Sequence, residues 1–196
     1  MAMKSLDSGS PTPEEIGKLT AEQKAVVASE YLKGVEPGFL PLPLFKELSR
    51  LMVINTVELV LLQPEDDIRV LLTKRPPTDP WWANQLHIPG SVTLPTDSVE
   101  GDDDFTGTLN RILEDELAGA IEIVGNVNFL EPQRRIGPRG HEVTTIHWAG
   151  ASVDESLLPN SARLLTLEDL QSYQPEAIVD GTIQTVDRAV QAYENT

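Results

Sequence analysis

The sequence predicts an α+β domain with helices on a mixed β-sheet, preceded by a helical extension. Two segments, 53–73 and 121–151, each contain two β-rich runs separated by a turn, which indicates two hairpins. A helical pattern at Thr108–Gly119 lies between the hairpins, and another closes the chain. Strand pairs interrupted by helices favour α+β over a regular strand–helix alternation. The 196 residues suffice for one core and an extension.

The first part of the chain is expected to be a lead-in followed by two helices. Thr20–Gln23 resembles a capping box, which opens the first helix, and a second short helix is predicted at about Leu44–Leu51. We therefore place an extension at residues 1–51 and the main domain at residues 52–196. The helices of the extension can cover the sheet or a second copy of the chain, so a homodimer stays open.

The first predicted hairpin follows the extension. Val53–Leu62 is a nearly continuous apolar run, as expected of a buried strand, and Ile68–Thr73 is its predicted partner. The apolar run contains one charged residue, Glu58. We expect its side chain to face solvent or a backbone partner.

The second predicted hairpin pairs Ile121–Glu131 with His141–Ala151. The turn between these strands is basic, and its arginines either pair with an acidic loop or bind a terminal phosphate: Arg134, Arg135 and Arg139. A short strand is predicted at Arg163–Thr166. Pro175 can open the last helix of the chain.

Composition and charge exclude several classes of function. The net charge is −16, from 31 acidic and 15 basic residues, so a nucleic-acid polymer is not expected as a partner. A small phosphorylated ligand stays open if a divalent cation neutralises it. The absence of cysteine excludes disulfides, thiolate metal sites and cysteine nucleophiles. The sequence contains no apolar run of about 18 residues, so no membrane span is predicted. It also shows no signal-peptide pattern, so the cytoplasm is the default location.

The central helical pattern contains a charged residue on its apolar face. At about 100° per residue, Glu116 falls on the face formed by Leu109, Ile112, Leu113 and Leu117. A carboxylate in an apolar stripe is costly unless a cation or hydrogen-bond donors compensate it. Glu116 is therefore either a boundary residue that reaches water or an arginine, or a residue with a chemical role.

Residues upstream of this helix favour a chemical role. Arg75, Trp82 and the turn His87–Gly90 precede Arg111–Glu116 in the chain. This order, together with the flanking strands, resembles the Nudix hydrolases over residues 53–193. The resemblance implies an α/β/α sandwich and a pyrophosphohydrolase that uses Mg²⁺ or Mn²⁺. Its implied substrate is a small phosphorylated molecule, a nucleoside diphosphate linked to another group.

The family's sequence box aligns with this chain only in part. Its first glycine falls on Ser91, directly after Pro89–Gly90, and its first glutamate falls on Asp97. The following loop is six residues longer than the family's, and the next box residues fall on Arg111, Ile112, Asp115 and Glu116. The closing glycine falls on Ala118, and Gly119 comes one place late.

The resemblance implies a metal site made of Glu116, Asp115 and Asp97. Arg111 would support Asp97, and Glu116, Asp115 and Arg111 form the implied catalytic set. Positions i, i+3 and i+4 of a helix place three carboxylates on one face, but Ile112 occupies the first of them. One alternative is therefore a catalytically impaired Nudix-fold module that binds a ligand or a partner. Another is that acidic residues within 100–104 replace the missing ligand.

The resemblance also implies substrate-binding roles for Arg75, Trp82 and Gly90. Arg75 would grip a substrate phosphate or close a surface salt bridge. Trp82 would stack on a base or ribose, although packing is the more common role of a tryptophan. Gly90 would let the backbone bend beneath the helix. His87 is expected to be a hydrogen-bonded scaffold residue rather than a base.

Overall fold

The computed structural model describes residues 12–35, 40–65, 67–97 and 105–196. The chain divides into two units, Met1–Leu40 and Pro41–Thr196. No helix in these described ranges is long and apolar enough to cross a membrane.

The first unit contains two helices, α1 (Pro13–Gly17) and α2 (Ala21–Leu32). The predicted capping box opens α2: the Thr20 hydroxyl accepts a hydrogen bond from the Gln23 amide at 3.2 Å, and the Gln23 side chain accepts one from the Thr20 amide at 2.9 Å. None of the α2 side chains is buried.

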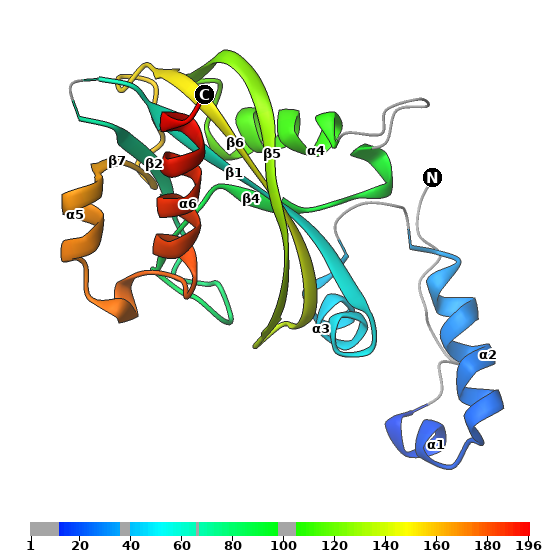
Figure 1. Ribbon diagram of the computed structural model, residues 1–196. Coiled ribbons are helices and arrows are strands. Elements are labelled where there is room, and N and C mark those ends of the chain that lie inside the picture. The colour runs from blue at the N-terminus through cyan, green and yellow to red at the C-terminus, as the bar shows by residue number, and fades with distance from the viewer. Residues whose placement is uncertain (1–11, 36–39, 66, 98–104) are drawn as a thin grey trace. The chain divides into compact units, whose positions relative to one another are not determined.

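The second unit is built on a mixed sheet, which has seven strands in the described part of the chain. Its order is β3-β2-β1-β6-β5, with β4 paired to β1 and β7 paired to β2 (Figure 1). β1 and β6 run parallel, and the other named pairs are antiparallel. The strands are β1 (Val53–Gln63), β2 (Arg69–Lys74), β3 (Leu86–His87), β4 (Gly90–Val92), β5 (Ile121–Gly137), β6 (Gly140–Val153) and β7 (Ala162–Thr166).

Helices lie on both faces of this sheet. α4 (Thr106–Arg111) continues into a π-helical turn, η2 (Ile112–Glu116), and packs on one face, whereas α6 (Thr182–Glu194) packs on the other. The remaining elements are α3 (Leu42–Leu51), α5 (Leu167–Ser172), and the 3₁₀ turns η1 (Pro95–Asp97) and η3 (Pro175–Ala177). This arrangement confirms the predicted α+β sandwich.

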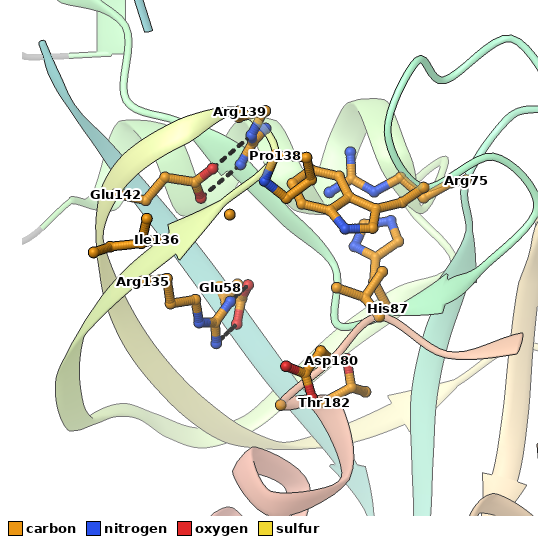
Figure 2. A pocket seen from close by; sticks show the side chains of 14 residues that line it. Glu58, Arg75, His87, Arg135, Ile136, Pro138, Arg139, Glu142, Asp180 and Thr182 are labelled. Carbon is orange, nitrogen blue, oxygen red and sulfur yellow. Dashed lines mark hydrogen bonds and ion pairs between the residues drawn. The ribbon is translucent and has the colours of Figure 1, made fainter. Parts of the chain in front are cut away.

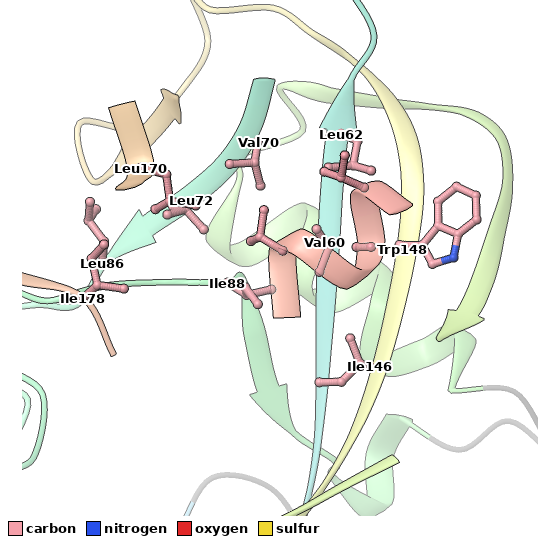
Figure 3. Close-up of a cluster of buried hydrophobic side chains, with 13 residues drawn as sticks. Val60, Leu62, Val70, Leu72, Leu86, Ile88, Ile146, Trp148, Leu170 and Ile178 are labelled. Carbon is pink, nitrogen blue, oxygen red and sulfur yellow. The ribbon is translucent and has the colours of Figure 1, made fainter. Parts of the chain in front are cut away.

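Each face of the sheet carries its own hydrophobic core. Successive strand residues point to opposite faces, so Val60 and Leu62 of β1 lie in the core on the α6 side of the sheet (Figure 3). Val186 of α6 is fully buried in the same core. Val57 and Leu59 belong to the second core, beneath α4 and η2. A strand segment that is buried on both faces needs apolar residues at successive positions, which explains the run from Leu59 to Leu62 in β1.

The second hairpin is longer than its sequence pattern predicted. β5 and β6 remain paired as far as Gly137 and Gly140, so only Pro138 and Arg139 form the turn. Most of the basic segment that was expected to be a turn is therefore strand. As a result, Arg135 lies on the sheet opposite Glu142.

The last helix begins later than expected. Pro175 opens the short turn η3, and α6 starts at Thr182 after Gly181, whose φ is +84°. Such a φ favours glycine and ends the preceding extended segment. The segment from Asp180 to Thr182 consequently lines a cavity instead of forming the interior of a helix.

α3 belongs to the second unit. A Cβ atom at Gly140 would collide with the Ser49 carbonyl, so the tip of the β5–β6 hairpin packs directly against the backbone of this helix. The expected boundary between residues 51 and 52 stays a prediction.

Candidate functional site

Glu116 lies at the end of η2 and is half-buried. One carboxylate oxygen accepts a hydrogen bond from the Gly90 amide at 3.4 Å. Burial raises the pKa of Glu116 to about 7, although the Gly90 amide and the positive charges of Arg75 and Arg111 oppose this rise. The carboxylate that the sequence placed on an apolar face therefore meets a backbone donor and two cations.

Gly90 allows this contact because it lies very close to β1. A Cβ atom at this position would be 2.8 Å from both the Val57 carbonyl oxygen and Glu58 Cγ. The Leu59 amide also donates to the Pro89 carbonyl at 2.9 Å, which holds the turn against the strand. Gly90 thus bends the backbone between β1 and the helix, as expected, while its substrate-binding role stays a prediction.

Asp97 is fixed by four groups. Arg111 donates from Nε and Nη2 at 2.9 and 2.7 Å, and the Thr108 hydroxyl and Leu94 amide each donate at 2.8 Å. The Arg111 hydrogen bonds, with the Leu94 and Thr108 bonds, lower the pKa of Asp97 to about 2 despite desolvation. Arg111 therefore supports Asp97, as the resemblance implied, and these bonds tie η1 to α4.

The other two helix positions that the family uses for metal ligands, 112 and 115, are less favourable. Ile112 is fully buried in the core, and Asp115 is exposed. Within the described residues, no group of three or more His, Asp or Glu side chains is arranged to hold a metal ion. Mg²⁺ commonly uses only one or two carboxylates together with water and substrate phosphates. Glu116 and Asp115 supply the two carboxylates that such an arrangement needs, and their role as ligands stays a prediction, while the acidic residues at 100–104 lie outside the described ranges.

A cavity of about 360 Å³ opens on the α6 face of the sheet (Figure 2). Its lining comes from β1, the loop after β2, β3, the β5–β6 hairpin, and the segment that leads into the start of α6. The charged side chains among its lining residues are Glu58, Arg75, Arg135, Arg139, Glu142 and Asp180. Three of the 15 basic residues of a strongly acidic chain thus meet in one cavity.

Two of these arginines form two-bond ion pairs. Arg135 donates to both Glu58 oxygens at 2.5 and 2.9 Å, and Arg139 donates to both Glu142 oxygens at 2.7 and 2.8 Å (Figure 2). Both pairs are partly shielded from water, which strengthens them relative to surface pairs.

Arg75 is held differently. Within the described part of the chain, its guanidinium makes one hydrogen bond, to Asp79 at 3.3 Å, and its buried Nε has no partner. Desolvation, followed by the charge of Arg139, lowers the pKa of Arg75, which remains a cation at ordinary pH. A guanidinium has five N–H donors, so Arg75 retains donors for an anion.

Trp82 lies beside two of the cavity's cations. The guanidinium carbons of Arg75 and Arg139 are 5.3 and 5.0 Å from the centre of its ring. Its backbone amide donates to Asp79 at 2.8 Å. The ring therefore makes cation–π contacts that gather Arg75 and Arg139 at one wall of the cavity.

His87 is a neutral scaffold residue within this wall. Its Nε2 shares a 3.0 Å hydrogen bond with the Thr73 hydroxyl. Burial, reinforced by the charge of Arg75, lowers the pKa of His87 to about 3. A ring that stays neutral at physiological pH is a poor general base, in agreement with the expected scaffold role.

Sequence reasoning missed Glu58 and Glu142. Glu58 was expected to face solvent or the backbone, but it pairs with Arg135, which is 77 residues away in the chain. The available signal was a lone charge in a buried strand, which needs a partner. Nothing in the local pattern indicated that Glu142 would be one of the buried charged residues.

Comparisons with known proteins give one family and several similar folds. The model of the NUDIX domain matches residues 52–188. The NUDIX domain of Shewanella oneidensis NrtR, solved with ADP ribose, is 17% identical with a TM-score of 0.55; the alignment covers 84% of this chain and 97% of that one. The C. elegans Ap4A hydrolase is 16% identical with a TM-score of 0.52, over 73% of this chain and 99% of that one.

A longer NrtR chain from Shewanella oneidensis, solved with a 27mer DNA, is 18% identical with a TM-score of 0.55. The alignment covers 71% of this chain but only 62% of that one, so this chain spans less than two thirds of that protein. At these identities the likeness shows the fold alone. No curated protein matches the sequence.

Proposed function

The chain belongs to the NUDIX-domain family, and we propose that it is a metal-dependent pyrophosphohydrolase acting on a nucleoside diphosphate linked to another group. The observation that carries this proposal is the position of Glu116. Its carboxylate lies at the Gly90 turn, within the electrostatic reach of Arg75, and Arg75 lines the arginine-rich cavity. A carboxylate that can hold a metal ion, within the electrostatic reach of an arginine that can bind phosphate, is the combination that diphosphate cleavage requires.

Arg75 and Arg139 are the proposed phosphate-binding residues. A diphosphate repels an attacking nucleophile, and guanidinium donors reduce that repulsion with directed hydrogen bonds. Trp82 holds the two side chains together through its ring. This contact favours a packing role for Trp82 over stacking on a base.

Glu116 and Asp115 are the residues that would hold a hydrated Mg²⁺ or Mn²⁺, together with the substrate phosphates. The bound ion supplies charge neutralisation and a more acidic water. Arg111 binds Asp97 of η1 and Ser91, the residue after Gly90, and so holds both segments against the helix. Asp97 is therefore proposed to position the loop and not to ligate the metal. Glu116 must release its proton before it can ligate, because its pKa is about 7.

A binding module without catalysis is the second candidate. Two observations favour it. Ile112, a buried core residue, occupies a position that the family uses for a metal ligand, and both Asp97 carboxylate oxygens already accept hydrogen bonds from the protein. Such a module would bind nucleotide derivatives without a divalent ion. The cytoplasmic location, a homodimer and the absence of a nucleic-acid partner stay predictions from the sequence.

One experiment separates the two candidates. The purified protein is incubated with ADP-ribose, nucleotide sugars, dinucleoside polyphosphates and NTPs, with Mg²⁺, Mn²⁺ or EDTA, and phosphate products are measured. The hydrolase proposal expects turnover on the order of one per second for one member of the panel, only with metal. It also expects Glu116→Gln to abolish turnover, with Glu114→Gln, at an exposed carboxylate two residues away, as the matched control.

Absence of turnover for every substrate, or turnover that survives Glu116→Gln, contradicts the hydrolase proposal. Calorimetric binding of a panel member in EDTA, without turnover, supports the binding module instead.

A further inference from the structure

The helix that carries Glu116 is irregular in its C-terminal half. α4 is α-helical as far as Arg111, but Ile112–Glu116 form a single π turn. The chain then leaves the helix through Ala118 and Gly119, with φ values of +52° and +70°. A π turn closes its hydrogen bond one residue later than an α turn, so it accommodates one additional residue.

The additional residue changes which side chains face the sheet. An α-helix advances about 100° per residue, which would place Glu116 in the middle of the apolar stripe and Leu117 at its edge. A π turn advances only about 85° per residue, about 15° less than an α-helix. Counted from Ile112, Leu117 is five residues further on and is therefore rotated back by about 75° from its α-helical direction, and Glu116, four residues further on, by about 60°. Leu117 then enters the middle of the stripe, and Glu116 moves to the edge on the Arg111 side.

Burial and contacts agree with the rotated positions. Leu117 is 0% exposed and belongs to the same core cluster as Ile112. Glu116 is half-buried, contacts the Gly90 amide and lies within the electrostatic reach of Arg111. The intervening Glu114 is exposed. In a continuous α-helix, the carboxylate of Glu116 would instead face the apolar core.

We propose that the π turn is the positioning element of this site: it absorbs one surplus residue in 112–116, seats Leu117 in the core and turns Glu116 toward Gly90. The one-residue delay of Gly119 relative to the closing glycine position at Ala118 is consistent with such an insertion. The π turn sets the positions of Glu116 and Leu117. This role is the same whether the site hydrolyses a ligand or only binds one.

Two changes of chain length at the same point test the proposal. Deletion of Glu114 leaves Glu116 four residues after Arg111 and Leu117 four residues after Ile112. Both pairs then share a face of an ordinary α-helix, and the placement is preserved. Insertion of one alanine after Glu114 adds a second surplus residue, which a single π turn cannot absorb. Glu114→Ala, which keeps the length, is the matched control.

The readout is the backbone amide resonance of Gly90 in ¹H–¹⁵N spectra, recorded in EDTA without ligand. Glu116→Gln is introduced into each background, and the shift that it causes at Gly90 is measured. The shift is expected in the parent chain, in Glu114→Ala and in the deletion variant, and it is expected to vanish in the insertion variant. Neither substrate nor metal is needed, so the result is independent of whether the hydrolase proposal fails.

Thermal unfolding provides the second measurement. The deletion variant is expected to melt at or above the midpoint of Glu114→Ala, and the insertion variant roughly 5–10 °C below it, because Leu117 leaves the core. The proposal is overturned if the deletion variant loses the Gly90 shift or fails to fold. It is equally overturned if the insertion variant keeps both the shift and the stability.

Discussion

Replacement of Asp97 by asparagine should remove a pH-dependent part of the protein's stability. The variant keeps the size of the side chain but loses the charge that Arg111, Thr108 and Leu94 bind. The folded pKa is about 2 against an ordinary value of 3.8, and at about 1.4 kcal/mol per pKa unit this difference corresponds to about 2 kcal/mol. The Asp97 side chain is only 7% exposed, so water screens the interaction little.

The sign of the pH effect follows from the direction of the shift. Because folding lowers the pKa of Asp97, its stabilisation is complete above about pH 5, declines as the pH falls from 3.8 toward 2, and is absent below about pH 2. Urea unfolding is measured at several pH values between 2.5 and 7. At pH 7, Asp97→Asn is expected to lower the free energy of unfolding by about 2 kcal/mol, and the difference from the parent should shrink in acid.

Glu47→Gln is the control for this prediction, because it also breaks an arginine–carboxylate pair. Glu47 and Arg50 are 67% and 66% exposed, and such surface pairs contribute roughly 0–1 kcal/mol. If Asp97→Asn were no more destabilising than Glu47→Gln, or if its effect were the same at pH 3 and pH 7, the reasoning about Asp97 would be refuted.

Three further predictions concern the helix end and the cavity. Ala118 has a φ of +52°, a conformation that costs a non-glycine residue about 1 kcal/mol. Ala118→Gly should therefore raise the calorimetric melting temperature by about 2–4 °C. A lower melting temperature would contradict this prediction. Arg75→Lys keeps the charge but loses the planar donors, so calorimetry should show about tenfold weaker ADP binding, with Arg50→Lys unchanged; equal losses in both variants would exclude a specific role. Binding of Mn²⁺ should weaken as the pH falls below about 7, because Glu116 then holds its proton. This dependence of Mn²⁺ affinity on pH should be absent in Glu116→Gln. If the variant retained it, the proton would belong to another group.

The fold was predictable where local patterns and burial agree. The apolar run of β1 predicted a strand buried on both faces, and the capping box at Thr20 predicted the start of α2. The capping box at Thr166, which opens α5, could also have been recognised, since Thr166 and Asp169 have the required spacing. The β5–β6 turn was misplaced because the arginines and glycines within 132–140 were interpreted as turn residues, whereas β5 continues to Gly137.

Within the site, the resemblance linked Arg111 to Asp97, whereas α-helical periodicity placed Glu116 in the middle of an apolar stripe whose edge it occupies because of the π turn. The pairing of Glu58 with Arg135 could not be predicted, because it depends on the parallel pairing of β1 with β6 and on the position of β5 beyond it. The π turn has no known composition signal, and only the late Gly119 hinted at it.

The charge balance of the cavity bears on the choice between hydrolase and binding module. Arg135 and Arg139 are each neutralised by a carboxylate that accepts two hydrogen bonds, and Arg75 has a weaker partner in Asp79. Asp180 adds a third carboxylate to the lining, so the charges of its three arginines and three carboxylates cancel, inside a chain with a net charge of −16. A diphosphate that enters alone would have to displace one of these carboxylates, whereas one that enters with a divalent cation brings its own neutralisation. This balance favours metal-dependent binding, and with it the hydrolase, even though Ile112 has replaced one helix carboxylate with core packing.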